Sequence, residues 1–359
     1  MPANHNYGLI LAGGRGTRFW PRSRRSNAKQ VLDFLGGGSL IQQTVARLRS
    51  VLPPERIWVL TNDHLRERII RQLPEVPKKQ ILAEPAQRNT APAIGLAAHI
   101  LQSVDPEAVM GVFPSDHFIS KPARYTRLVR AALKSASKGK MAVLGIQPRW
   151  PETGYGYIEF PEGVTAGSIE ETPVQKFREK PDQATAEQFL ASGRFYWNAG
   201  MFFWKASVFL DALRHHLPRT ASILAALPKF GNRNFTAKVA EAFPHYEDIS
   251  VDYAVLEKAT GVVGFASDDF GWNDVGSWDA VHALVKKDAS GNAERLDSII
   301  VDSTGNYIDA TGKLVALLGV KDLIVVDTPD ALLIADRSRA QQVGNIVKLL
   351  EKRRRDDLL

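Results

Sequence analysis

Two patterns of hydrophobic and polar residues alternate along the first 150 positions. Short runs of consecutive apolar residues predict buried strands, and apolar residues spaced three or four positions apart predict amphipathic helices. The predicted strands are 7–11, 57–60, 109–113 and 141–146. One predicted helix follows Ser39, one is capped at Thr90, and one lies near 125–135. Strands that alternate with helices in this way are typical of a mostly parallel sheet covered by helices.

The pattern changes twice further along the chain. From residue 155 it predicts mixed strands at 155–160, 174–177 and 199–204, with helices at 206–216 and 250–259. After residue 288 come short apolar pieces separated by turns that contain Gly or Asp, namely 298–301, 307–308, 314–318, 323–326 and 331–334, and then a helix over 339–355. The short pieces predict a small β-coil, and their spacing would also fit a β-meander. We therefore predict an α/β fold, with a Rossmann-like domain over 1–288 and a small β-helix-like domain with a terminal helix over 289–359.

The composition is that of a folded globular protein. The chain has 359 residues, of which 44% are hydrophobic and 24% charged, and it contains no cysteine. The absence of cysteine excludes disulfides, thiolate catalysis and cysteine-bound metals. No apolar run approaches the ~20 residues that a membrane span needs, and residues 1–6 do not have the pattern of a secretory signal. We therefore expect a cytoplasmic protein that does not bind a membrane.

The net charge is +7, with an isoelectric point near 9.4. Basic residues are concentrated in the first thirty positions and at 352–355, and aromatic residues are not interleaved with them as a nucleic-acid stacking surface requires. The distribution therefore predicts a small anionic ligand and no nucleic acid. The basic run at 352–355 suits the end of a helix.

A glycine-rich turn follows the first predicted strand. The segment from Ala12 to Thr17 contains Gly13, Gly14, Arg15 and Gly16, and residues 1–30 contain no Asp or Glu. Glycines allow a close approach of backbone N–H groups to phosphate oxygens, and arginines add fixed cationic donors. The turn therefore predicts a phosphate cradle, although its spacing is neither that of a dinucleotide fingerprint nor that of a P-loop.

Two aspartates are candidates for binding a metal. Asp116 follows the predicted strand 109–113, and Asp274 lies in an aromatic, glycine-bounded loop at 270–278. Magnesium takes one or two protein carboxylates and completes its shell with phosphates and water. A turn or a helix cap explains Asp116 equally well.

Four further residues could contact a ligand, but each also fits a simple turn. They are Gly154 in a Gly-Tyr-Gly-Tyr run, the neighbours Glu179 and Lys180 before a proline, and Asn198 before Ala-Gly. Taken singly, none of these residues identifies a site.

Eight segments together resemble the sugar-phosphate nucleotidyltransferases, and within them the family of mannose-1-phosphate guanylyltransferases. The segments are 11–18, Lys29-Gln30, 84–93, 114–117, 154–158, 177–181, 197–202 and 272–278. The resemblance covers nearly the whole chain, and the 88–93 and 272–278 segments are specific to the guanylyltransferase branch. Several members carry an additional C-terminal isomerase domain. The present sequence has no room for that domain, so we expect the short, monofunctional form.

The resemblance implies a role for each candidate residue. Residues 12–17 bind the triphosphate, Arg18 and Lys29 act in catalysis, and Asp116 and Asp274 hold Mg²⁺. The guanosine part is contacted by Glu84, Asn89 and Thr90, and the sugar phosphate by Gly154, Glu179, Lys180, Asn198 and Asp252. The C-terminal pieces would form a truncated left-handed β-helix, which usually supports a homodimer.

One departure from the family is Ala28, because the family usually has proline before the lysine of the Lys29-Gln30 pair.

The implied reaction joins GTP and mannose 1-phosphate to give GDP-mannose and pyrophosphate. The alternatives are a nucleotidyltransferase for another hexose or nucleotide, a nucleotide-sugar glycosyltransferase, and a non-catalytic nucleotide sensor. Glycosyltransferases usually carry an Asp-x-Asp motif, and none lies near Asp116.

Overall fold

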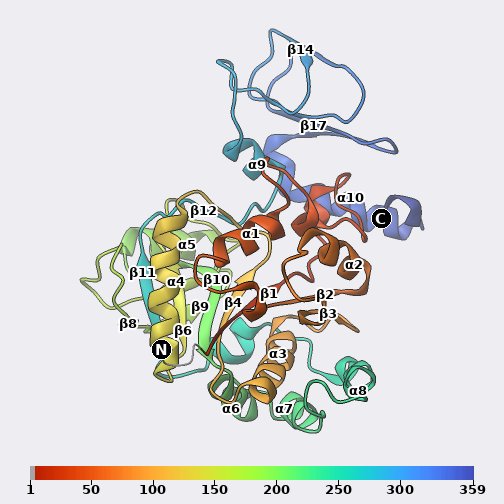
Figure 1. The fold of residues 1–359 in the computed structure, drawn as a ribbon. Coiled ribbons are helices and arrows are strands. Elements are labelled where there is room, and N and C mark those ends of the chain that lie inside the picture. The colour runs from red at the N-terminus through yellow and green to blue at the C-terminus, as the bar shows by residue number, and fades with distance from the viewer. Residues whose placement is uncertain (1–4) are drawn as a thin grey trace.

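The computed structural model describes residues 5–359 and consists of a large α/β body with a smaller β-rich domain above it (Figure 1). Residues 1–4, part of the segment in which no secretory signal was predicted, lie outside the described residues. The C-terminal helices lie between the β-rich domain and the α/β body (Figure 1). The predicted α/β fold class is confirmed.

The central sheet is mixed and mostly parallel at its core. Its main path runs β3-β2-β1-β4-β10-β6-β11-β8, and β7 and β9 extend it beside β10. Only β10 in the middle of this path is antiparallel to both of its neighbours, β4 and β6. The strands are β1 (Asn6–Leu11), β2 (Ile57–Asn62), β3 (Ile81–Glu84), β4 (Val109–Pro114), β6 (Ala142–Ile146), β7 (Tyr157–Glu159), β8 (Thr172–Pro173), β9 (Lys176–Arg178), β10 (Phe195–Lys205) and β11 (Val263–Ser267).

Helices cover both faces of this sheet, and each face has its own hydrophobic core. One core contains residues of α3 (Thr90–Val104), α6 (Ala206–His216), α7 (Pro218–Ala225) and α8 (Phe235–Ala242). The other contains residues of α1 (Leu40–Leu48), α2 (Asp63–Gln72), α4 (Pro122–Ser137) and α5 (Gln183–Ser192). Because both faces are covered, the central strands are almost continuously apolar, as buried parallel strands are.

Two short strands join segments that are far apart in the sequence. β5 (Phe118–Ile119) pairs antiparallel with β12 (Trp272–Asn273). This pairing holds the chain after β4 beside the loop that leads into α9 (Trp278–Leu284). The two segments that carry the candidate metal-binding aspartates are therefore neighbours.

The C-terminal strands pair mostly in parallel, as the coils of a β-helix do. β13 (Ala293–Glu294) pairs with β15 (Tyr307–Asp309), β15 with β17 (Leu323–Asp327), and β14 (Ser298–Val301) with β16 (Val315–Leu318). Only β18 (Leu332–Asp336) runs antiparallel to its neighbour, β17. Parallel pairing of successive strands favours the β-coil over the meander, because a meander pairs its strands antiparallel.

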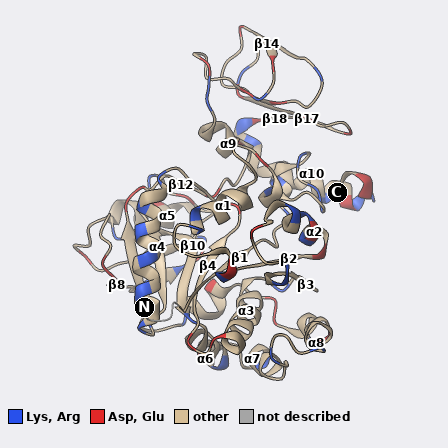
Figure 2. Ribbon diagram, viewed as in Figure 1, with Lys and Arg blue, Asp and Glu red and all other residues tan. Residues whose placement is uncertain are grey.

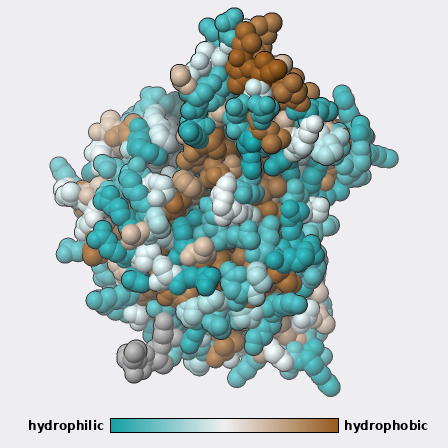
Figure 3. Space-filling view, turned by 45° about the horizontal axis from the view of Figure 1, so that its top comes forward, coloured by the Kyte–Doolittle hydropathy of each residue, from teal (hydrophilic) through white to brown (hydrophobic). Residues whose placement is uncertain are grey.

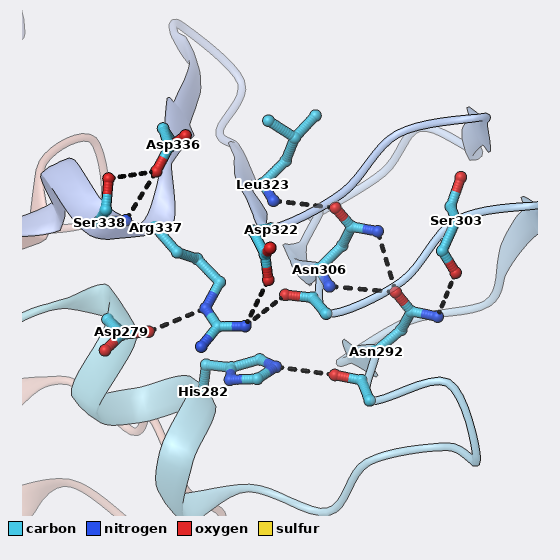
Figure 4. Close-up of polar contacts among 12 residues, drawn as sticks. Asp279, His282, Asn292, Ser303, Asn306, Asp322, Leu323, Asp336, Arg337 and Ser338 are labelled. Carbon is cyan, nitrogen blue, oxygen red and sulfur yellow. Dashed lines mark hydrogen bonds and ion pairs between the residues drawn. The ribbon is translucent and has the colours of Figure 1, made fainter.

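Buried asparagines connect successive coils. Asn306 donates through its backbone and side chain to the Asn292 side-chain oxygen at 3.0 and 2.9 Å, and its own Oδ1 accepts from the Leu323 N–H at 2.9 Å (Figure 4). Each buried amide therefore has partners on two coils, which removes the cost of leaving it unpaired.

Arg337 joins the two domains. Its guanidinium donates to Asp279 of α9 at 2.8 Å and, on the side of the β-rich domain, to the Gly305 carbonyl at 2.7 Å and Asp322 at 3.2 Å (Figure 4). A shared hydrophobic core, which includes Phe19, Trp278 and Tyr307, lies at the same junction. The junction is therefore both polar and apolar.

Several predicted elements differ in detail from the structure. The predicted strand 174–177 overlaps only β9, because residues 174–175 lie between β8 and β9. The predicted helix 250–259 is a short π-helix, Asp252–Leu256. The predicted terminal helix is a 3₁₀ segment, Arg337–Val343, followed by α10 (Gly344–Lys352). Asn89, and not Thr90, is the N-cap of α3.

The surface charge is also broader than the sequence analysis described. Basic residues recur along α4, where Lys and Arg mark much of the visible side of the helix (Figure 2). The basic residues concentrated in the first thirty positions and at 352–355 are therefore joined by a further basic face on α4. Within residues 5–359, every helix is too short or too polar to cross a lipid bilayer.

Candidate active site

The glycine turn lies directly after β1, and a buried glutamine holds it from inside. The Gln30 side-chain amide donates to the Ala12 carbonyl at 2.6 Å and to the Gly14 carbonyl at 3.0 Å. A Cβ atom added to Gly14 would meet nothing within 4 Å. The outer side of the turn is therefore open to a ligand, while its inner side is fixed by hydrogen bonds.

Gly16 brings the turn into contact with Lys29. Its φ is +61°, and an added Cβ would lie 2.6 Å from the Lys29 Cβ and 2.9 Å from the Lys29 nitrogen. A side chain at this position would displace Lys29 and strain the backbone, so the position requires glycine.

Lys29 connects both candidate metal-binding segments. Its ammonium lies 2.9 Å from Asp116 Oδ2 and donates to the Asp274 carbonyl at 2.5 Å. Burial alone would raise the pKa of Asp116, but the nearby Lys29 ammonium and His117 hold it below its ordinary value. Asp116 is therefore an anion at neutral pH. The predicted Lys29, Asp116 and Asp274 are all brought together.

The Asp274 loop is shaped by contacts from three directions. The Tyr155 hydroxyl donates to Asp274 Oδ1 at 2.7 Å, and Arg18 donates to the Gly276 carbonyl at 3.2 Å. Val275 has a φ of +48°, a strained conformation for a β-branched residue. Strain of this kind persists only where surrounding contacts enforce it, and it is concentrated at functional sites.

His117 lies beside this cluster as a neutral imidazole. Burial lowers its pKa to about 4, and the Trp272 indole donates to its Nδ1 at 3.1 Å. A neutral His117 leaves the positive charge of the cluster to Lys29 and to arginines, among them Arg47, which donates to the His117 carbonyl at 2.8 Å.

The oxygen donors of Asp116 and Asp274 fit the chemistry of Mg²⁺. Both carboxylates belong to segments held together by the β5–β12 pair, and magnesium prefers oxygen ligands. Within residues 5–359 there is no group of three or more His, Asp or Glu side chains arranged to hold a metal ion. Two carboxylates would suffice for a magnesium ion that also binds substrate phosphates.

The residues predicted to contact guanosine lie at the end of β3 and the start of α3. An added Cβ on Gly13 would lie 3.6 Å from Glu84 Oε1, so Glu84 borders the glycine turn. Burial raises the pKa of Glu84 to about 8, so its carboxyl is mostly protonated at pH 7. Asn89 has a φ of +62°, and the Thr90 hydroxyl accepts from the Val251 N–H at 2.9 Å.

The residues predicted to contact the sugar form a second cluster. The Asn198 amide donates to Asp252 Oδ1 at 3.0 Å, and Glu179 pairs with Lys180 at 3.0 Å. Glu179 Oε2 is buried and has no hydrogen-bond partner in residues 5–359. Burial first, and the Glu179 charge second, raise the pKa of Asp252 to about 6. A buried acceptor without a partner suits a ligand hydroxyl.

Two predicted residues have different surroundings from those expected. Gly154 is exposed, and its N–H donates to Glu152 at 2.9 Å, whereas Gly156 packs directly against Glu179. Arg15 pairs with Glu351 of α10 at 2.6 Å. The sequence analysis did not select Gln30, Gly156 or Tyr155 as site residues.

The comparison with known proteins agrees with this geometry. The family model described as nucleotidyl transferase matches residues 7–291, and the model described as MannoseP isomerase/GMP-like beta-helix domain matches residues 297–350. The chain is 40% identical over 353 residues to the xanthan biosynthesis protein XanB of Xanthomonas campestris, which covers 97% of this chain and 74% of that protein. It is 38% identical over 357 residues to a mannose-1-phosphate guanylyltransferase of Klebsiella pneumoniae, with 97% and 74% covered.

Solved structures agree with the sequence relatives. A crystal structure from Thermus thermophilus, described as mannose-1-phosphate geranyltransferase, is 30% identical with a TM-score of 0.84, and covers 97% of this chain and all of that one. A Helicobacter pylori structure described as mannose-6-phosphate isomerase is 27% identical with a TM-score of 0.60, and covers 75% of this chain. The likeness therefore extends through both domains.

Proposed function

Because this chain belongs to the mannose-1-phosphate guanylyltransferase family of the nucleotidyl transferases, we propose that it forms GDP-mannose and pyrophosphate from GTP and mannose 1-phosphate. The observation that carries the proposal is the position of Lys29, which contacts both the Asp116 carboxylate and the Asp274 carbonyl below the glycine turn. Phosphoryl-type transfer needs positioned positive charge more than a protein nucleophile.

The reaction is an in-line displacement. A phosphate oxygen of mannose 1-phosphate attacks the α-phosphorus of GTP, a new phosphorus–oxygen bond forms, and the bond to the pyrophosphate oxygen breaks. The attacking oxygen is already anionic, so no general base is required. Pyrophosphate carries the displaced electron pair away.

Residues of the turn bind and orient the triphosphate in this proposal. The Ala12 N–H donates to the Leu60 carbonyl at 2.7 Å, so Ala12 only leads into the turn, and the backbone N–H groups of residues 13–17 face the phosphates. Arg15 adds a cationic donor. Arg18 and Lys29 offset the charge that develops on the phosphorus oxygens. Asp116 and Asp274 would hold Mg²⁺, which when bound neutralises phosphate charge and aligns the triphosphate.

Two further groups of residues bind the rest of the substrates. Glu84, Asn89 and Thr90 contact guanosine. Glu179, Asn198 and Asp252 read the sugar hydroxyls, and Lys180 faces the sugar phosphate, with Gly154 on the loop above. A protonated Glu84 is suited to donate a hydrogen bond to a base, which a carboxylate cannot do.

We also propose that the catalytic domain spans 1–288, that the β-rich domain spans 289–359, and that the protein is a cytoplasmic homodimer. Apolar side chains gather on the β-rich domain at the top of the molecule (Figure 3). Val301 and Leu318 pair in register across β14 and β16 and are 45% and 73% exposed. An exposed apolar surface of this kind is typical of a protein interface.

The test is a matrix of GTP, ATP, UTP and CTP against mannose, glucose and galactose 1-phosphates, scored by pyrophosphate release. We expect release for GTP with mannose 1-phosphate, and a loss of about 10²–10³ in turnover for Lys29→Ala. The control is Lys121→Ala, which removes an exposed lysine that donates to the Asp269 carbonyl. Release with UTP alone would contradict the base assignment, and release from no pair would contradict the enzymatic function.

A further inference from the structure

We propose that a phosphate-bearing metabolite binds between the two domains, in a cavity separate from the glycine turn. The cavity has a volume of about 610 Å³, within the range of small-molecule sites. None of the residues of the glycine turn, and neither Asp116 nor Asp274, lines it. The cavity is therefore a second site and not a part of the catalytic one.

Four separate parts of the chain form the walls of this cavity. They are the segment that follows Arg18, the loop and helix start at 33–42, the outer turn of α2, and the β-rich domain at Arg295 and 328–330. A ligand held here would contact both domains at once.

The lining carries an excess of positive charge. It contains four arginines against two aspartates. One pair is internal, because Arg24 lies 3.0 Å from Asp330. The other aspartate, Asp33, accepts three backbone N–H groups of its own loop, from Leu35, Gly36 and Gly38.

The remaining three arginines have few anionic partners. Arg22 lies 3.5 Å from Asp309, and Arg295 donates to the Asp33 carbonyl at 2.5 Å. Arg68 forms no hydrogen bond or ion pair with any residue between 5 and 359. Arg68 and Arg295 therefore face this cavity with no carboxylate within ion-pair distance in the described chain.

A phosphate group is the ligand that this lining fits. Guanidinium groups bind phosphate through paired N–H donors. With Asp309, the partner of Arg22, counted beside the two aspartates of the lining, the four arginines still leave an excess of one positive charge for an anion. The volume leaves room for a sugar or a nucleoside attached to the phosphate. The carboxylates of Asp33 and Asp330 are already paired or hydrogen-bonded, so they oppose the anion weakly.

The ligand would act on the catalytic site through the wall it contacts. Val31 and Leu32 line the cavity, and only Gln30 separates them from Lys29. Pro21 and Arg22 line it as well, shortly after Arg18. A ligand that fixes this wall therefore changes how firmly Lys29 and Arg18 are held, and so changes the affinity for the nucleotide.

The binding test labels arginines of the parent protein with phenylglyoxal and measures the rate at each site by peptide mass spectrometry. The probes are inorganic phosphate and glucose 6-phosphate, with sodium chloride at equal ionic strength as the reference. The matched control is Arg71, an exposed arginine of the same helix α2 that does not line the cavity.

We expect Arg68 to react about tenfold more slowly when a probe exceeds its Kd tenfold, because about one site in ten then stays free. Arg71 should react at an unchanged rate. Protection by inorganic phosphate alone identifies the free ion as the ligand, and stronger protection by glucose 6-phosphate identifies a phosphate ester. An unchanged rate at Arg68 with both probes, or equal slowing at Arg71, overturns the site. This result does not depend on catalysis, so it is separate from a failure of the proposed function.

The kinetic test measures the KM for the nucleotide with and without the protecting probe. We expect a change of at least about twofold in the parent protein, and no change in Arg68→Ala or Arg295→Ala. Both variants should keep the parent KM when no probe is present, because neither residue lies in the catalytic cluster. A KM that responds equally in parent and variants shows competition at the catalytic site and overturns the coupling.

Discussion

Arg15 of the phosphate cradle donates to Glu351 of the C-terminal helix at 2.6 Å. The two side chains are 40% and 36% exposed. Exposed ion pairs contribute only about 0–1 kcal/mol, so a bound triphosphate can displace the Glu351 carboxylate from Arg15. Under the proposed function, the C-terminal helix therefore competes weakly with the nucleotide for one cation.

Removing the charge of Glu351 should tighten nucleotide binding. Glu351→Gln is expected to lower the KM for GTP by about two- to fivefold, because the competing carboxylate contributes at most about 1 kcal/mol. Steady-state kinetics at fixed mannose 1-phosphate measure this effect. Asp357→Asn, which removes an acid paired with Arg355 on the same tail, is the control and should leave the KM unchanged. A higher KM in Glu351→Gln would show that Glu351 supports the cradle instead of competing with it.

Removing the Tyr155 hydroxyl should lower the affinity for Mg²⁺. The hydroxyl donates to Asp274 Oδ1 and so fixes the orientation of that carboxylate. Loss of such a supporting contact typically costs 10–100-fold in metal affinity, so Tyr155→Phe should need about tenfold more Mg²⁺ for half-maximal turnover. Turnover at saturating Mg²⁺ should stay within about threefold of the parent.

The control for this prediction is Tyr253→Phe, because Tyr253 is 44% exposed. Its magnesium titration should coincide with that of the parent. If Tyr155→Phe loses turnover equally at every Mg²⁺ concentration, Tyr155 acts on the substrate and not through the metal.

The pH dependence of stability should change when Asp252 is replaced. Burial and Glu179 raise its folded-state pKa to about 6 from an unfolded value of 3.8, so the native state binds the proton more tightly. Between these two values stability falls as pH rises. Asp252→Asn removes this loss and should raise the free energy of unfolding at pH 8 by about 1–3 kcal/mol relative to the parent. At pH 3.5 the two proteins should differ far less. Urea unfolding at the two pH values measures the difference, and an equal effect at both would contradict the titration of Asp252.

A charged residue on the β14–β16 surface should separate the proposed dimer. Leu318→Lys places a charge on a side chain that is 73% exposed, so it costs little in folding but opposes an apolar interface. We expect a shift to monomer in sedimentation velocity at micromolar concentration. Val104→Lys, at an exposed apolar position at the end of α3, is the control. A parent protein that sediments as a monomer would contradict the proposal directly.

The sequence predicted the fold well where the pattern is local. The helix at 206–216 and the strand at 298–301 have the predicted bounds in the structure. By contrast, α2 buries only Leu65 and Ile69, so its apolar pattern was too sparse to identify it. The π-helix at Asp252–Leu256 was predicted as an α-helix because apolar spacing does not distinguish the two.

The site could be predicted only in part. The glycine turn is continuous in sequence and was found from the residues themselves, whereas the meeting of Lys29 with Asp116 and Asp274 depends on the β5–β12 pairing. Asp116 and Asp274 were selected as metal candidates from their residue type and their places after a strand and in a glycine-bounded loop, but no spacing in the sequence shows that they meet. Tyr155 was missed because no local signal indicates that its hydroxyl reaches a carboxylate 119 positions away.

Ala28 has a backbone conformation that proline can adopt. Its φ is −70° and its ψ is 165°, close to the φ that a proline ring imposes. No hydrogen bond from its N–H occurs within the described chain, and the preceding Asn27 forms an isolated antiparallel β-bridge with Arg24. A proline here would lose no hydrogen bond and would restrict the unfolded chain.

Ala28→Pro should therefore stabilise the protein by about 0.4–1 kcal/mol, which corresponds to a rise in Tm of about 1–3 °C. Differential scanning calorimetry measures the shift. The control is Ala186→Pro within α5, where the Ala186 N–H donates to the Asp182 carbonyl at 2.9 Å, and this change should cost about 3 kcal/mol. Ala28 is only 1% exposed, so a lower Tm in Ala28→Pro would mean that the ring atoms overfill the space around the start of the Lys29 segment.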